Sequence, residues 1–163
     1  MMKKILYVAP VLMLALTGCG YRAGSLINPD IRTVHIAMFD NKDFRHEVEF
    51  ALTEAVKSEV LRRTHLKLAD RHAAQTVLEG TITKIVPSTI AYDQFDRIFS
   101  QNLTVTIQFK WRRLDDNRVL ASADELSYTA QLLAVRGETE AVTTAEAFQD
   151  LAELIVERMQ EDF

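Results

Sequence analysis

An alternation of apolar and polar side chains from Leu103 to Trp111 constrains the fold more than any other feature of this chain. Such a period of two is typical of a β-strand with one buried face. A turn is expected at Asp115-Asp116-Asn117, and residues 119–129 form the returning strand of a hairpin. The chain therefore needs an apolar layer to cover one face of an antiparallel sheet. The apolar members of the alternation are Leu103, Val105, Ile107, Phe109 and Trp111.

Two amphipathic helices are predicted to form that layer. Each shows apolar residues repeating at three and four positions. The first is expected to begin at an N-cap, Asn41 or Asp43, and the second at the capping-box pair Thr143 and Glu146. The first stripe comprises Phe44, Val48, Ala51, Leu52, Ala55, Val56 and Val60, and the second comprises Phe148, Leu151, Ala152, Ile155 and Met159.

Shorter apolar runs predict three further strands, at residues 34–39, 66–69 and 77–86, with Pro87 ending the last of them. The order of elements indicates an α+β fold. We expect a two-layer sandwich with two helices packed on one face of a roughly four-stranded mixed sheet. A right-handed crossover makes residues 34–39 and 77–86 parallel. Loops 87–102 and 133–142 then lie together, at the end away from the N-terminus.

The sole cysteine, Cys19, ends a hydrophobic leader that begins with Lys3 and Lys4. The sequence Leu16-Thr17-Gly18-Cys19 resembles the lipobox of bacterial lipoproteins, in which the chain is cut before the cysteine and the cysteine carries lipid. This predicts a signal peptide at 1–18, a lipidated N-terminus and tether at 19–32, and a single α+β domain at 33–163. Because Gly20 is not the inner-membrane retention residue Asp, the outer membrane is the expected destination. An ordinary secretory leader with an incidental cysteine is the alternative.

Charge and motif content exclude several classes of function. The net charge is −4, and removal of the leader with its two lysines would make it −6. A chain this acidic is a poor general ligand for nucleic acid. With Cys19 lipidated, no thiol remains for a disulfide or a metal site. The sequence has no nucleophile elbow, no glycine-rich phosphate loop and no metal-like histidine spacing. We therefore expect no enzyme activity, no metal and no cofactor.

The predicted loop 87–102 is rich in aromatic residues, namely Tyr92, Phe95 and Phe99. Long loops in compact domains are often functional, and aromatic anchors favour a contact with a partner protein. The alternative is that these side chains extend the strands and fill the core.

Three cations are expected near that end of the sheet. Arg97 lies in the first loop, Arg136 lies in the second, and Lys84 is expected near the end of its strand. Converging cations, guanidinium groups above all, suit a phosphate. Solvated surface charges, or ion pairs with nearby carboxylates, are the alternative.

Taken in order, several short motifs resemble the LptE family of outer-membrane lipopolysaccharide-assembly lipoproteins. They are Cys19-Gly20-Tyr21, residues 34–41 leading into a helix, Leu78-Glu79-Gly80-Thr81-Ile82, the strand 104–111 with its hairpin, and the C-terminal helix. The resemblance covers nearly all of the mature chain.

The resemblance to LptE implies a two-helix, four-stranded fold held at the periplasmic side of the outer membrane by the N-terminal lipid. It implies a stable complex with the LptD barrel, which the lipoprotein plugs, and binding of lipopolysaccharide during assembly into the outer leaflet. Basic loop residues of the family match Arg97 and Arg136 by position. The competing interpretation is a lipid-anchored regulator or scaffold of a cell-envelope enzyme or secretion channel.

Overall fold

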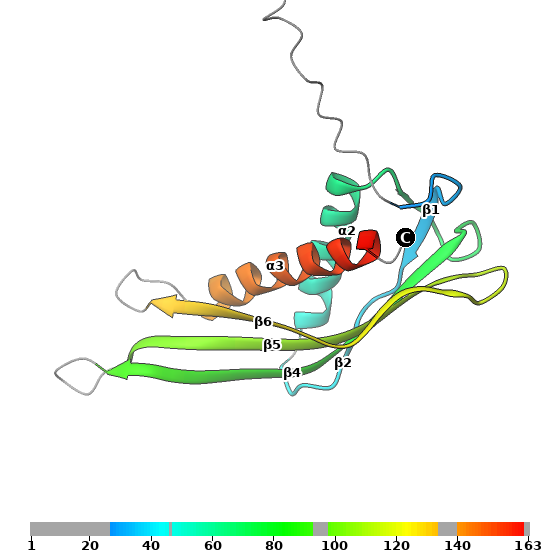
Figure 1. Cartoon of the computed structure of the whole chain (residues 1–163). Coiled ribbons are helices and arrows are strands. Elements are labelled where there is room, and N and C mark those ends of the chain that lie inside the picture. The colour runs from blue at the N-terminus through cyan, green and yellow to red at the C-terminus, as the bar shows by residue number, and fades with distance from the viewer. Residues whose placement is uncertain (1–26, 46, 93–97, 134–139, 162–163) are drawn as a thin grey trace, which may run out of the picture.

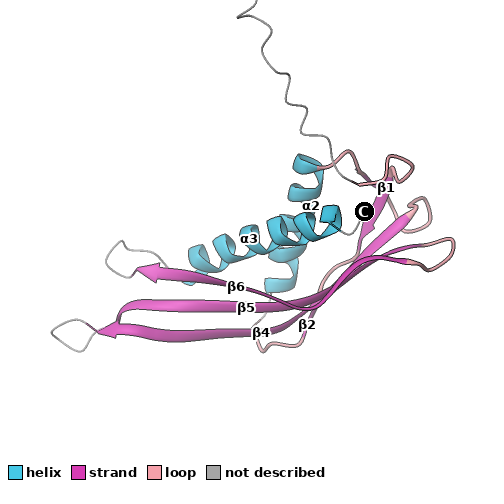
Figure 2. Ribbon diagram, in the orientation of Figure 1, coloured by secondary structure: helices cyan, strands magenta, loops and turns pink. Residues whose placement is uncertain are grey.

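The computed structural model describes residues 27–45, 47–92, 98–133 and 140–161. Helices α2 (Val48–Arg63) and α3 (Glu140–Glu161) cover one side of a mixed sheet (Figures 1 and 2). The strand order is β3-β1-β4-β5-β6, with β2 beside β4. The predicted α+β class is confirmed, but the sheet has six strands rather than about four. They are β1 (Thr33–Ile36), β2 (Asp40–Asn41), β3 (Lys67–Leu68), β4 (Thr76–Tyr92), β5 (Ile98–Arg113) and β6 (Val119–Leu133).

The three long strands β4, β5 and β6 run together to one end of the molecule (Figure 1). β4 and β6 are both antiparallel to β5, and β1 is parallel to β4, as the sequence predicts. β1 pairs with β4 only at Thr76, Val77 and Leu78. At about 3.3 Å per residue, β4 then continues for roughly 45 Å to Tyr92. The sheet is therefore a long blade that extends well beyond β1.

The core lies between the sheet and the two helices. All five apolar residues of the 103–111 alternation are buried, and Trp111 is fully enclosed. The α3 stripe is also buried throughout, which confirms that prediction. Ile27 and Ile31 belong to the same core, so packing begins within the segment expected to be a tether. No helix in the described part of the chain is long and apolar enough to cross a membrane.

The predicted start of the first helix is wrong. Phe44 is 98% exposed, and α2 begins only at Val48, after Glu47 has taken a left-handed conformation with φ 68°. Asn41 and Asp43 do not cap α2, because their side chains stabilise the preceding loop instead. Asn41 Nδ2 donates to the Arg45 carbonyl, and Asp43 Oδ2 accepts the backbone N–H of Ile85.

Two other predicted boundaries are also wrong. The strand expected at 34–39 ends at Ile36, because the chain leaves β1 there and rejoins the sheet as β2. α3 begins at Glu140, before the predicted capping box, and Thr143 lies buried within it.

Pro87 does not end its strand. It pairs in register with Leu103, and β4 continues to Tyr92. The Ile85 N–H points away from β5, toward Asp43, and the alternation of the strand places the Pro87 nitrogen on the same side. Within the described residues, β4 has no partner there other than β5. The Pro87 nitrogen, which carries no hydrogen, therefore lies on the free edge of β4. A proline there removes no hydrogen bond between strands.

Phe39, which lies between β1 and β2, contacts both α2 and β4. Its backbone N–H donates to Thr53 Oγ1 on α2 at 3.0 Å. Its ring packs directly on Gly80 of β4, so closely that a Cβ at residue 80 would overlap three ring atoms, the farthest of them 2.8 Å away. Glycine is thus required at position 80 by close approach of a side chain.

A buried carboxylate links the two helices. Glu59 on α2 is fully enclosed and accepts hydrogen bonds from Arg62, at 2.6 Å, and from Gln149 on α3, at 3.0 Å. It also pairs with Arg63. Both arginines reach Glu153 on α3. Burial lowers the pKa of Arg63, but the surrounding carboxylates outweigh this effect and raise it overall.

Gly80→Ala is expected to lower the free energy of unfolding by about 1–3 kcal/mol, because the added methyl group overlaps the Phe39 ring. Urea unfolding measures the change. Combining it with Phe39→Leu should cost less than the sum of the two single changes, since the smaller side chain removes the overlap. Strict additivity would show that the two residues do not clash.

Glu59→Gln is expected to destabilise the protein by about 1–3 kcal/mol, because the amide keeps the shape but loses the charge-assisted bonds. The matched control is Glu54→Gln, which removes the exposed pair with Lys57 and should cost less than about 0.5 kcal/mol. Equal unfolding midpoints for the two variants would contradict a structural role for the buried network.

Candidate functional site

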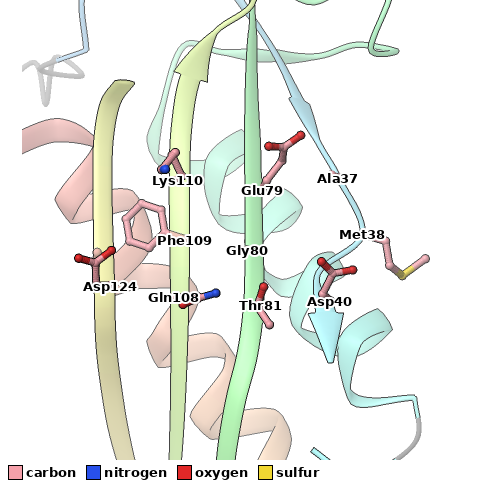
Figure 3. Close-up of a pocket in the computed structure, with 11 residues that line it drawn as sticks. Ala37, Met38, Asp40, Glu79, Gly80, Thr81, Gln108, Phe109, Lys110 and Asp124 are labelled. Atoms are coloured by element: carbon pink, nitrogen blue, oxygen red, sulfur yellow. The ribbon is translucent and has the colours of Figure 1, made fainter. Parts of the chain in front are cut away.

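The face of the sheet opposite the helices carries a polar depression across β4, β5 and β6 (Figure 3). Side chains on this outer face are mainly hydroxyls, amides and charged groups, because only the inner face is covered by α2 and α3. The outer face therefore gathers hydrogen-bonding groups from three neighbouring strands.

Two β-bulges converge at the middle of this face. On β4, Ile82 pairs with Ile107 and Lys84 with Thr106, which leaves Thr83 as an extra residue. On β6, two residues, Asp124 and Glu125, lie opposite the single residue Gln108. Bulges redirect side chains and are frequent beside functional sites. Here both flanking strands are bulged at the same level of β5.

Two open hollows meet at the bulges and share Asp124. One has a volume of about 460 Å³ and the other about 510 Å³. We refer to the pair as the outer trough. The first is lined by Ala37, Met38, Asp40, Glu79, Gly80, Thr81, Gln108, Phe109, Lys110, Ala123 and Asp124; the second by Thr83, Lys84, Val86, Thr104, Thr106, Asp124 and Glu125.

The charges of the trough are nearly balanced. Glu79 is paired with Arg71 at 3.1 Å and Arg112 at 3.2 Å, so its charge is largely compensated. The remaining carboxylates belong to Asp40, Asp124 and Glu125, and the cations are Lys84 and Lys110.

The floor of the second hollow is held by hydrogen bonds between strands. Thr104 and Thr129 share a hydroxyl–hydroxyl bond of 2.9 Å, and Thr106 and Ser127 share one of 3.2 Å. The Thr83 hydroxyl donates to the Thr106 carbonyl across the bulge. These bonds fix the positions of the hydroxyl groups before any ligand arrives.

β6 is held from its inner side by Tyr128, which is hydrogen-bonded to Asp150 of α3. This bond raises the pKa of Tyr128, and partial burial and the nearby carboxylates of Glu146 and Glu153 raise it further. The strand that carries Asp124 and Glu125 is thus tied to the helix layer a few residues beyond its bulge.

The structure describes three of the site residues predicted from sequence, of which Tyr92 and Phe99 lie at the same end of the sheet and Lys84 does not. Lys84 lies exposed in mid-strand, eight residues before the end of β4, rather than near that end, because β4 is longer than expected. Tyr92 is the last residue of β4 and Phe99 the second of β5, so neither lies in a loop. Cys19, Phe95, Arg97 and Arg136 lie outside the described residues.

Sequence reasoning missed most of the outer trough. Gln108 and Lys110 were polar members of the alternating strand, and Asp124 and Glu125 belonged to its returning partner. One signal was available, because two consecutive acidic residues interrupt the returning strand, as a bulge allows. The hollow itself depends on the register between strands, which no local pattern shows.

The family of the chain follows from its sequence. The model of the LptE family, described as lipopolysaccharide-assembly, matches residues 31–159. The chain belongs to this family. The match includes all six strands, α2 and nearly all of α3. No curated protein matches the chain significantly.

Solved structures share the fold at low sequence identity. The hypothetical protein CT253 from Chlamydia trachomatis has a TM-score of 0.54 and 8% identity, covering 79% of this chain and 98% of its own. The PelC dodecamer from Paraburkholderia phytofirmans has a TM-score of 0.53 and 9% identity, covering 85% and 89%. Uncharacterized lipoprotein B from Nitrosomonas europaea has a TM-score of 0.51 and 15% identity, covering 86% and 88%. These likenesses establish the fold alone.

Tyr128→Phe is expected to remove a pH dependence of stability. In the unfolded chain Tyr128 loses its proton near pH 10, and in the folded protein it does so at higher pH. Its contribution is therefore complete below about pH 10 and is lost as the pH rises through the folded pKa. Urea unfolding from about pH 9 to about pH 11 should show the wild type falling toward the variant. Parallel curves would contradict the Asp150 bond.

Proposed function

We propose that this protein is an outer-membrane lipoprotein, anchored through Cys19 on the periplasmic side, that plugs an LptD-type barrel, binds lipopolysaccharide and assists its assembly into the outer leaflet. It acts without catalysis and without a cofactor. The observation that carries the proposal is the family match over residues 31–159, which spans the folded part of the chain.

The shape of the sheet supports a plug. β1 begins at Thr33, close to the lipid-bearing N-terminus in sequence, and β4 extends beyond its pairing with β1 by roughly 45 Å at about 3.3 Å per residue. The hydrocarbon core of a bilayer is about 30 Å thick. A blade of this length, anchored at one end and aligned with a barrel axis, carries its far end across the membrane.

The same topology supports a contact at the far end. Tyr92 pairs with Ile98, and Ser100 pairs with Leu133, so three strand ends lie together there. Arg97 directly precedes β5, and Arg136 follows β6 by three residues. In our proposal these cations engage phosphates of lipopolysaccharide. The barrel wall is contacted by Tyr92, Phe95 and Phe99. Lys84 contributes a further positive charge from the outer face of the sheet.

The partnership is tested by expressing the full-length, lipidated protein in its host and isolating what remains bound after mild detergent extraction. Recovery of a large β-barrel protein in equal amount supports the plug. Recovery of the lipoprotein alone, or with a periplasmic enzyme, would overturn it in favour of a regulator or scaffold of envelope machinery.

Arg97→Glu combined with Arg136→Glu is expected to weaken lipopolysaccharide binding by about a hundredfold, because two charge-assisted hydrogen bonds are lost. Binding by the wild type should also weaken as salt is raised. The measurement is titration of the purified, lipidated protein with lipopolysaccharide.

The matched control for this charge reversal is Lys67→Glu combined with Arg118→Glu. It makes the same change of charge at the opposite end of the sheet, where both residues are exposed. Equal loss in both double variants would assign the effect to net charge, and unchanged binding in a folded Arg97/Arg136 variant would remove the proposed clamp.

A further inference from the structure

The two long edges of the sheet are protected unequally. On the β4 side, β1 and β2 cover the beginning of the strand, and Asp43 and Pro87 interrupt the row of donors beyond them. On the other side, β6 is the last strand of the sheet within the described residues (Figure 2). Proteins usually block a free edge with proline, lysine or short length. β6 runs for 15 residues and contains no proline and no basic residue.

The bulge at Asp124 and Glu125 divides this edge into two parts. The part beyond the bulge comprises residues 126–133, none of which is charged. Uncharged segments of this length, without proline or glycine, pair readily with a further strand. We refer to the outward side of residues 126–133 as the open edge.

The register shows which backbone groups face outward. The Ile85 N–H points away from β5, so its partner Val105 directs its own backbone groups toward β6, where it pairs with Tyr128. Tyr128 therefore bonds to β5. By alternation, its neighbours Ser127 and Thr129 present their backbone N–H and C=O groups at the open edge. Within the described residues, no further strand pairs with them there.

The charges around the open edge select the kind of strand that fits it. Glu146 and Asp150 of α3 lie near Tyr128, whose phenol is hydrogen-bonded to Asp150. Asp124 and Glu125 are exposed at the bulge. The lysines of the outer trough belong to β4 and β5, so carboxylates are the charges that lie next to the open edge. A second copy adding its own β6 would bring like charges together, whereas a basic strand is attracted.

We propose that the open edge of β6 binds an extended, basic segment of a partner protein as an additional strand. The backbone groups of Ser127 and Thr129 supply hydrogen bonds to any sequence, and the surrounding carboxylates select basic side chains. This binding requires only the fold of the chain and the charges beside β6, so it stands apart from the proposed function.

The test uses full-length, lipidated protein in detergent and a synthetic peptide as long as the open edge, in which lysine alternates with valine. Fluorescence anisotropy should show binding that weakens as salt is raised. Residue-resolved hydrogen exchange should show rapid exchange of the Ser127 and Thr129 amides in the protein alone. Bound peptide should slow both by about tenfold or more, while Tyr128 exchanges slowly throughout.

Two altered peptides separate strand addition from attraction of charge. A peptide with N-methylated backbone amides keeps every lysine but donates no backbone hydrogen bond to β6, so its affinity should fall by about tenfold or more. A peptide with glutamate in place of lysine keeps the backbone donors but is repelled by the carboxylates, and it should also bind more weakly.

Thr129→Pro is expected to lower the affinity for the lysine peptide by about tenfold, because it removes an outward donor and leaves the hydrogen bonds between β6 and β5 in place. The matched control is Thr129→Val. It loses the hydroxyl bond to Thr104, as the proline variant does, but keeps the backbone N–H, so it should bind like the wild type.

A charge variant tests the site if Thr129→Pro lowers the unfolding midpoint. Asp124→Asn combined with Glu146→Gln keeps the shape of both side chains and should reduce the affinity by about fivefold. The matched control, Glu54→Gln combined with Asp70→Asn, removes the same charge from exposed positions on α2 and after β3, and should leave binding unchanged.

Four results would overturn the proposal. The first is no binding of the lysine peptide. Equal affinity for the N-methylated peptide would reduce the contact to charge alone. Protection of the Ser127 and Thr129 amides in the protein alone would show that its own chain or a second copy already occupies the edge. Equal affinity in folded Thr129→Pro and the wild type would place the peptide elsewhere.

Discussion

The contact between Phe39 and Gly80 determines how the rest of the fold is arranged. The chain leaves β1 after Ile36 and returns as β2, and Phe39 is the residue between them that enters the core. Its backbone N–H is held by Thr53 of α2, and its ring needs the space that glycine leaves on β4. The start of the helix layer is therefore positioned against the sheet at this point. β2 then pairs with Thr81 and Ile82, immediately before the bulge that forms one side of the outer trough.

The parts of this fold that sequence could predict are those in which one local period decides burial. The strand around Ile107 and the α3 stripe around Leu151 were identified correctly, because a period of two or of 3.6 exposes one face whatever the neighbours are. The residues at which helices begin were harder to predict. Asn41 and Asp43 are good capping residues, yet they bond to the loop and to β4. The competing partner, Ile85, is distant in sequence, so no local pattern indicates it.

The candidate functional residues likewise include some that the sequence predicted and some that it did not. The cations Arg97 and Arg136 were singled out because topology alone groups their loops, and the observed strand directions agree with that topology. The outer trough was not found, because it depends on a mismatch in register between β5 and both its neighbours. Lys84 illustrates the difference: its strand was identified, but the length of that strand moved the residue from the expected end to the middle of the sheet. The LptE family match supports lipopolysaccharide assembly for the chain as a whole. It does not show whether the strand ends or the outer trough takes part.

Pro87 has a consequence for how copies of this protein behave toward one another. A long strand edge with every amide group free is a template on which a second chain can add a strand, and such addition leads to aggregation. Here one donor of that template is absent, and Asp43 occupies another two residues earlier. When newly made copies meet at high local concentration, the row of backbone N–H donors on the edge of β4 is therefore interrupted. Pro87 and Asp43 together therefore limit strand addition along a stretch of β4 that no other strand of the described residues covers.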